Sequence, residues 1–172
     1  MVGKIKAMDY SIIDLANKII EQAQKSGVKR LGLTKLQKLV YYVYGEYLLR
    51  QNIRLIKDDE PQKWPHGPVF FQLYKETRTM GMIDKINCKT LETLENIEIT
   101  KDKQLDHTNL DAIIAEVLQN YGERTATALS KDTHRSGYAW DKTQDFGLII
   151  ADKHVIDEFN EREQENNRIS TQ

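Results

Sequence analysis

The residues of this chain that are best suited to chemistry are four histidines, one cysteine and a few neighbouring carboxylates. The histidines are spread along the chain, and no two of them stand three or four residues apart, the spacing that places two metal ligands on one helical face. The chain has no H-E-x-x-H or C-x-x-C motif and no glycine-rich phosphate loop. The sequence therefore predicts no metal ion and no cofactor.

A nucleophilic pair of Cys88 with His134 is the main catalytic alternative. Cys88 lies in a polar segment where neither a helix start nor a cationic pocket is predicted to lower its pKa, which favours an inert thiol. Asp58 and Asp59 stand side by side in a predicted loop, where a solvated turn explains them. We therefore expect a protein that binds another macromolecule and is not an enzyme.

The composition is that of a folded protein without a membrane span. The chain has 172 residues, of which 40% are hydrophobic and 30% charged, which favours one domain with its own core. No stretch reaches the roughly 18 consecutive apolar residues that a membrane helix requires. The segment from Met1 to Ala7 is followed by no apolar region, so no secretory signal is expected. A single cysteine excludes an internal disulfide and favours a reducing cytoplasm.

The net charge of −1 gives no global argument for binding nucleic acid, but the charge is unevenly distributed. Residues 1–50 hold nine basic side chains and four acidic ones, whereas residues 152–172 hold six acidic and three basic ones. This asymmetry either steers a charged partner or reflects two solvated faces. A helix-turn-helix within residues 11–50 is disfavoured, since its connection from Ser26 to Leu33 is long and its second helix presents aromatic residues. A DNA-binding transcriptional regulator of a mobile element or phage is the alternative function.

Hydrophobic periodicity predicts a mainly α fold, a compact multi-helix single domain with a very small two- or three-stranded sheet. Capping patterns predict where four of the helices begin, at Ser11, Thr34, Thr108 and Thr125, and Asp152 is expected to begin the last helix. The helix after Thr34 carries aromatic residues on both flanks and is expected to be central. Its internal Gly45 is expected to allow close approach of another backbone.

The segment around the first two prolines is expected to be a loop with a short strand near Gln62 to Trp64. Gly67 and Pro68 are expected to open a third helix. Ile97 and Ile99 alternate with polar residues, which predicts a strand that pairs with the segment before Trp64. The resulting organisation is an N-terminal extension over residues 1–10, a helical domain over 11–162, and a polar, disordered tail over 163–172.

Three stretches taken together resemble one known family. They are Leu33–Tyr42 (LTKLQKLVYY), the turn Trp64–Val69 (WPHGPV), and Leu129–His134 followed by Ala139-Trp140. Their order and separation are similar to those of the Panacea domain, also called the SocA-like antitoxin domain. The resemblance covers roughly residues 11–159, and its most specific part is the W-x-x-G-P turn preceded by the L-T-K-L-Q-K-L helix.

The resemblance implies a small, mainly helical bacterial or phage-associated protein that is encoded beside a toxin on a mobile element. Such antitoxins neutralise a cognate protein toxin of a toxin-antitoxin system by direct binding, and some act as proteolytic adaptors. The implied partners are the toxin, a protease or chaperone, and the operator DNA of its own operon, with no membrane. The resemblance names neither the toxin nor the oligomeric state.

We expect the second helix and the Trp64–Pro68 turn to form one face for the partner. The residues expected to contact the partner are Lys35, Lys38, Tyr42, His66 and Phe71. The residues expected to support this face from behind are Thr34, Gln37, Tyr41, Trp64, Gly67, Pro68, Thr133, His134 and Trp140. For each tryptophan and histidine taken alone, a purely structural role within a loop is the competing interpretation.

Overall fold

The computed structural model describes residues 5–83, 86, 94–95, 97–99 and 107–172. The described residues form seven helices and two sheets of two strands each, so the predicted mainly α fold is confirmed. The helices are α1 (Ile12–Lys25), α2 (Leu33–Gln51), α3 (Phe71–Thr77), α4 (His107–Tyr121), α5 (Ala126–Thr133), α6 (Ala139–Lys142) and α7 (Asp152–Ser170). The strands are β1 (Ile5–Ala7), β2 (Pro61–Trp64), β3 (Gly67–Phe70) and β4 (Ile97–Ile99).

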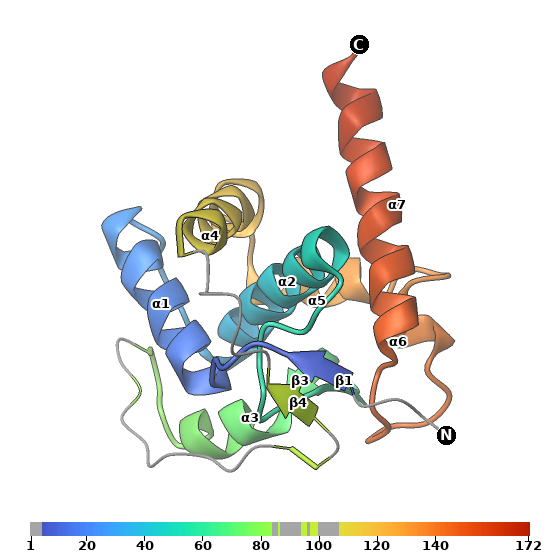
Figure 1. Cartoon of the computed structure of the whole chain (residues 1–172). Coiled ribbons are helices and arrows are strands. Elements are labelled where there is room, and N and C mark those ends of the chain that lie inside the picture. The colour runs from blue at the N-terminus through green and yellow to red at the C-terminus, as the bar shows by residue number, and fades with distance from the viewer. Residues whose placement is uncertain (1–4, 84–85, 87–93, 96, 100–106) are drawn as a thin grey trace.

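Helix α2 lies in the middle of the molecule, with α1 and α4 on one side and α7 on the other (Figure 1). It packs against α1, α3, α4, α5, α7 and β3. A helix that is apolar or aromatic around its whole circumference is stable only when it is surrounded. The predicted central position of this helix is therefore confirmed, and most of its residues from Lys35 to Leu48 are buried.

Three buried tyrosines tie α2 to the C-terminal half of the chain. Each hydroxyl donates a hydrogen bond to a carboxylate on another element, in the pairs Tyr41–Glu158 (2.8 Å), Tyr42–Asp132 (2.6 Å) and Tyr44–Asp152 (2.8 Å). A buried phenol requires such a partner, because an unpaired polar group in the core is destabilising. These pairs fix the positions of α5 and α7 relative to α2.

Gly45 allows α7 to approach α2 closely. A Cβ atom at this position would lie 2.1 Å from the Cε2 atom of Phe159, which is far inside van der Waals contact. The close approach was correctly predicted, but its partner is an aromatic ring and not another backbone. The glycine is needed because the Phe159 ring packs directly on the α2 backbone.

Two of the predicted helix caps are confirmed and one is wrong. The Ser11 hydroxyl accepts a hydrogen bond from the amide of Asp14, and the Thr125 hydroxyl accepts one from the amide of Ala128. By contrast, α2 begins at Leu33 after Gly32, so Thr34 lies inside the helix and does not cap it. The side chain of Thr108, predicted to cap the helix that follows it, lies outside the described part of the chain.

Asp58 and Asp59 are not solvated turn residues, because both are buried. Asp58 accepts a hydrogen bond from the amide of Ile12 at the start of α1. Asp59 accepts hydrogen bonds from the amides of Gln72 and Leu73 at the start of α3. The interpretation of these residues as a surface pair was wrong, since each carboxylate caps a helix that is distant in sequence.

The cap at Asp59 leads to a prediction. Replacing Asp59 with alanine is expected to lower the free energy of unfolding by about 1–2 kcal/mol, because two helix amides lose their acceptor. Burial raises the pKa of Asp59 to about 7, while the amides that donate to its carboxylate oppose this rise. Asp59→Asn keeps an acceptor oxygen and is expected to lose less stability than Asp59→Ala in urea unfolding. Equal losses for both variants would contradict the capping role.

Two strand assignments differ from the prediction. β2 pairs antiparallel with β3, so Gly67 and Pro68 begin a strand, and the third helix begins only at Phe71. β4 pairs in parallel with β1 and not with the segment before Trp64. The pairing was wrong because strand partners depend on long-range packing that the local alternation does not contain. Cys88 lies outside the described residues.

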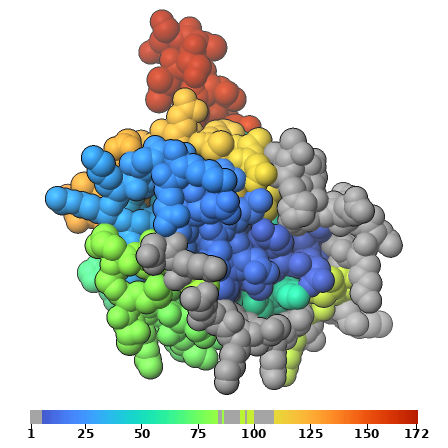
Figure 2. Space-filling model, turned by 90° about the vertical axis from the view of Figure 1, so that its left-hand side faces the viewer, coloured from blue at the N-terminus to red at the C-terminus, as the bar shows by residue number. Residues whose placement is uncertain are grey.

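The limits of the packed region also differ from the prediction. Residues Ile5–Ala7 form β1, and the side chains of Ala7 and Met8 are buried, so this stretch is part of the domain. At the other end, α7 continues to Ser170, whereas a disordered tail was expected from residue 163. Figure 2 shows the last turns of α7 projecting from the body of the molecule.

No helix in the described ranges is long and apolar enough to cross a bilayer.

Candidate functional site

The turn between β2 and β3 is held by side chains from three helices. The Trp64 carbonyl accepts a hydrogen bond from the Trp140 indole (2.8 Å). The His66 carbonyl accepts one from the Ser130 hydroxyl (2.9 Å), and the Pro68 carbonyl accepts one from the Lys38 amine (2.9 Å). The His134 Nε2 atom lies 3.0 Å from the Pro65 carbonyl oxygen. Turn carbonyls usually face water, so four side-chain contacts in one short turn make the backbone unusually rigid. We call residues 64–68 with these contacts the clamped turn.

Gly67 permits this packing because nothing larger fits. Its φ of +109° lies in the region that L side chains rarely adopt. A Cβ atom there would lie 2.6 Å from both the Cε atom of Lys38 and the Oγ1 atom of Thr133. The glycine of the W-x-x-G-P motif thus brings together all three sequence stretches that carried the resemblance.

Replacing Gly67 with alanine is expected to lower the free energy of unfolding by about 2–3 kcal/mol. About half of this comes from the unfavourable φ and the rest from overlap with Lys38 and Thr133. Urea unfolding measures the loss. Gly137→Ala is the matched control, because it also has a positive φ (+84°) but no atom within 4 Å of the added Cβ. A loss no larger than that of the control would mean that the close packing on Gly67 is unimportant.

His134 and Trp140 pack on each other beneath the clamped turn. Their ring centroids are 3.9 Å apart, and the Nδ1 atom of His134 faces the Ser130 carbonyl oxygen. The Lys63 amine lies 4.2 Å from the Trp140 ring centroid and donates a hydrogen bond to the Thr143 carbonyl. A cation over an indole is attractive, so the lysine adds to the fixation of the ring. Both rings thus contact the backbone of the clamped turn.

Gln37 fixes the far end of β3 to α2. Its side-chain amide donates to the Phe70 carbonyl (3.1 Å), and its side-chain oxygen accepts from the Phe70 amide (2.8 Å). The glutamine therefore pairs with Phe70 as a neighbouring strand would. It joins the two most specific parts of the motif, the α2 helix and the hairpin.

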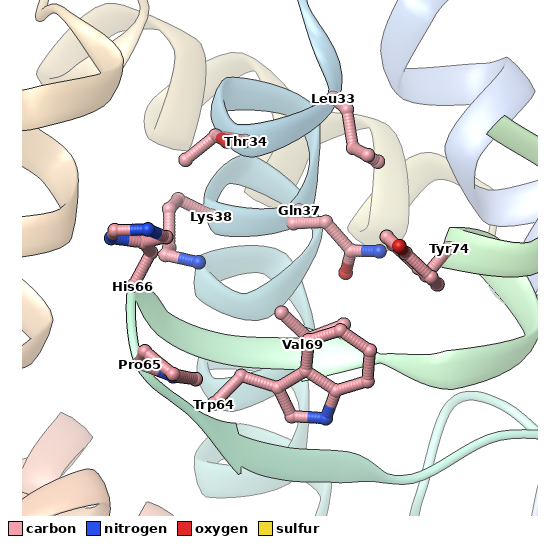
Figure 3. Close-up of a pocket in the computed structure, with 9 residues that line it drawn as sticks. All are labelled: Leu33, Thr34, Gln37, Lys38, Trp64, Pro65, His66, Val69 and Tyr74. Atoms are coloured by element: carbon pink, nitrogen blue, oxygen red, sulfur yellow. The ribbon is translucent and has the colours of Figure 1, made fainter. Parts of the chain in front are cut away.

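A pocket of about 250 Å³ opens between the start of α2 and the hairpin (Figure 3). It is lined by Leu33, Thr34, Gln37, Lys38, Trp64, Pro65, His66, Val69 and Tyr74. Five of these nine residues, Thr34, Gln37, Lys38, Trp64 and His66, belong to the sets predicted to contact a partner or to support the contact face. The sequence did not indicate a cavity at this position.

Lys38 is the one strongly perturbed group in the pocket wall. Its side chain is 1% exposed, and burial lowers its pKa to about 7. Figure 3 shows its amine directed into the space framed by Gln37, Trp64 and His66. Among the described residues, no carboxylate forms an ion pair with this amine.

The structure does not place all the expected contact residues on the surface. Tyr42 is 0% exposed, stacks on Tyr121 at 4.1 Å and bonds to Asp132, so it cannot touch a partner of the folded chain. Lys35 is also buried and donates to the Lys29 carbonyl. These two expectations are corrected, because the tyrosine packs in the core and the lysine amine folds back onto the loop before α2.

His66 and Phe71 remain as exposed residues at the rim of the site. Phe71 is 38% exposed, and its ring centroid lies 6.3 Å from that of the half-buried Trp64. Pro65 is exposed as well. The surface therefore consists of the turn itself and the first residue of α3, with α2 beneath it. We call Pro65, His66 and Phe71 the rim.

Sequence reasoning missed three residues of the site, Ser130, Val69 and Tyr74. Ser130 lies on a helix flank with no distinguishing pattern. The signal that could have found it is the W-x-x-G-P turn, because a rigid turn requires donors from elsewhere.

Two other kinds of site, a metal site and a DNA-reading helix, were considered for the described part of the chain. No group of three His, Cys, Asp or Glu residues there could hold a metal ion. Helix α2, which was weighed as a DNA-reading helix, is packed on all sides and presents no free face to a groove.

The fold and site define a small helical domain that displays a rigid surface turn. Among known families, the antitoxin SocA-like, Panacea domain matches residues 36–141. This span is more than half of the chain, so the chain belongs to the SocA-like antitoxin family with the Panacea domain, as the motifs predicted. It contains the clamped turn with the four side chains that contact it, and it ends before α7. No curated protein and no solved structure matches the chain.

Proposed function

We propose that this chain is an antitoxin that neutralises a cognate protein toxin by direct binding through the clamped turn and its rim. Membership of the SocA-like family supports an antitoxin role and a protein partner. The observation that carries the proposal is the clamped turn, whose four side-chain contacts hold a surface loop in one conformation. Binding through a rigid loop loses little conformational entropy, which favours tight association.

The rim has the composition of a binding surface. Pro65 and His66 are exposed on the fixed turn, and the Phe71 ring lies against that of Trp64. Aromatic side chains in such a position often provide the anchors of an interface. The buried polar groups nearby hold the turn, so we propose binding without catalysis.

The proposal is tested with the reading frame next to this gene. Its product is expressed alone and together with this chain, and growth is measured. We expect growth arrest with the neighbouring product alone and recovery when both are present. Toxin abundance then separates two routes: an undiminished level indicates blocking, and a reduced level indicates delivery to a protease. A harmless neighbouring product, or arrest that this chain does not relieve, would contradict the proposal.

The rim leads to a further prediction. The double variant His66→Ala, Phe71→Ala is expected to weaken toxin binding by about 30-fold or more, since two anchors are worth about 2 kcal/mol or more. Its melting temperature should stay close to that of the unchanged chain, because both side chains are exposed. Ile169→Ala is the matched control, as this apolar residue is 74% exposed at the end of α7. Unchanged affinity in the double variant would place the interface elsewhere.

A further inference from the structure

The amine of Lys38 has fewer partners than a charged lysine can bind. An ammonium group carries three N–H donors, and among the described residues its hydrogen-bond acceptor is the Pro68 carbonyl. None of the nine residues that line the pocket is acidic. A buried cation without an anionic partner is destabilising, which explains the direction of its pKa. The folded chain therefore holds this amine at a position that an anion would stabilise.

The rest of the pocket is mainly apolar. Leu33, Val69 and the Trp64 ring contribute to its walls, and its volume of about 250 Å³ is enough for one side chain. Pockets of this kind bind a group with an apolar body, while one polar contact fixes its orientation. The complementary group is an aliphatic stem that ends in a carboxylate.

A glutamate side chain fits this description better than the carboxylate at the end of a chain. Terminal carboxylates are captured by successive backbone N–H groups. Here the cationic group inside the pocket is a side-chain amine, and the backbone of β3 is already paired with β2. A single amine suits a single side-chain carboxylate that enters between Trp64 and Gln37.

We infer that the pocket beside the clamped turn is an anchor site for a glutamate side chain of the protein partner, with its stem against Trp64 and Val69 and its carboxylate on the Lys38 amine. The partner in this inference is that of the proposed function, but the chemistry of the pocket is independent of it. Together with the rim, the pocket would give the interface a charged anchor beside an aromatic one. Such an anchor adds selectivity, because a partner without the acid would leave the amine unpaired.

The inference is tested on the isolated chain by nuclear magnetic resonance. The probe is a glutamate residue blocked at both ends (N-acetyl, N′-methylamide), and the reporters are the Trp64 indole N–H and the amide of Val69. We expect a saturable shift of both signals, with at least tenfold weaker binding of the blocked glutamine. A blocked-N-terminus leucine with a free α-carboxylate is the third probe, and we expect it to bind at least tenfold more weakly than the blocked glutamate.

Two variants complete the test. Lys38→Met is expected to remove the preference for glutamate over glutamine, while Lys25→Met, an exposed lysine on α1, should leave it unchanged. Equal binding of glutamate and glutamine to the unchanged chain, or no shift with either, would overturn the inference. Stronger binding of the free α-carboxylate would replace the glutamate with a chain terminus and so overturn it as well.

Failure of the inference and failure of the proposed function can be told apart. If Lys38→Met still relieves the growth arrest fully and the glutamate probe does not bind, the pocket inference fails and the antitoxin role stands. If the probe binds selectively but the unchanged chain relieves no arrest, the chemistry of the pocket stands and the antitoxin role fails.

Discussion

Replacing Arg162 with alanine is expected to lower the free energy of unfolding by about 3–5 kcal/mol, the largest loss that we predict for a single substitution. Arg162 is 4% exposed and donates to Glu158 through Nε (3.0 Å) and Nη2 (2.8 Å). Its Nη1 atom donates to Asp132 at 2.6 Å. Removal of the guanidinium leaves two carboxylates without their counter-ion, of which Glu158 is fully buried and Asp132 mostly buried.

The loss should be large because Arg162 also packs on rings. Its Cζ atom lies 4.5 Å from the ring centroid of Tyr138 and 5.0 Å from that of Tyr42. The Tyr41 hydroxyl donates a hydrogen bond to Glu158 in the same network, so α2, α5 and α7 are joined at this point. Alanine would thus remove both the charge pairing and the cation–π contacts.

Urea unfolding of Arg162→Ala measures this effect, and Arg135→Ala is the matched control. Arg135 forms an ion pair with Glu165 on the surface, where both side chains are well exposed. Such a pair contributes about 0–1 kcal/mol. If the two variants lost similar stability, the buried network could not be what holds α7 against α2.

The second large effect concerns the variant Lys38→Met. Its difference in stability from the unchanged chain is expected to change sign with pH. Burial lowers the pKa of Lys38 to about 7, whereas an unfolded lysine titrates near 10.5. Below pH 7 both states hold the proton, and the folded chain bears the full cost of the buried charge. Between pH 7 and 10.5 the unfolded chain holds more protons than the folded chain, so stability due to Lys38 rises with pH.

Methionine has a similar length and no charge, so Lys38→Met is expected to be more stable than the unchanged chain at pH 6, by about 2–4 kcal/mol. Near pH 10 the neutral lysine still donates to the Pro68 carbonyl, which methionine cannot do. There the variant should be less stable by about 1 kcal/mol. Urea unfolding at both pH values, with Lys25→Met as control, measures the difference. A difference independent of pH would show that the amine is not desolvated in the folded chain.

The helices were predictable from the sequence because their signals are local. Ser11 and Thr125 cap helices through amides three residues away, and the apolar stripe of α1 repeats at helical spacing. The tyrosine-rich α2 was expected to be central for the same reason. Thr34 was misleading because Gly32 precedes the helix and the threonine lies one residue inside it.

The parts that could not be predicted depend on partners distant in sequence. Asp59 looked like a surface residue, and only the folded chain brings it to the start of α3. Tyr42 looked like a contact residue because polar atoms on a helix usually face water. Its burial follows from its hydrogen bond to Asp132, a partner that periodicity cannot assign.

The W-x-x-G-P motif was predictable from the sequence only in part. Its order and spacing were enough to indicate the family, which the match over residues 36–141 confirms. The glycine at position 67 signalled an unusual backbone, but it was taken for the start of a helix. The packing of Lys38 and Thr133 on its Cα atom explains why the three stretches occur together.

We propose that the chain neutralises a toxin by direct contact through the clamped turn and its rim. Calorimetric titration of the purified chain with the purified product of the neighbouring reading frame is the sharpest test of this proposal. We expect a tight complex, with a dissociation constant on the order of nanomolar, that the His66→Ala, Phe71→Ala variant weakens by about 30-fold and Ile169→Ala does not. A neighbouring product that arrests growth and yet shows no heat of binding at micromolar concentration and no co-elution would contradict it.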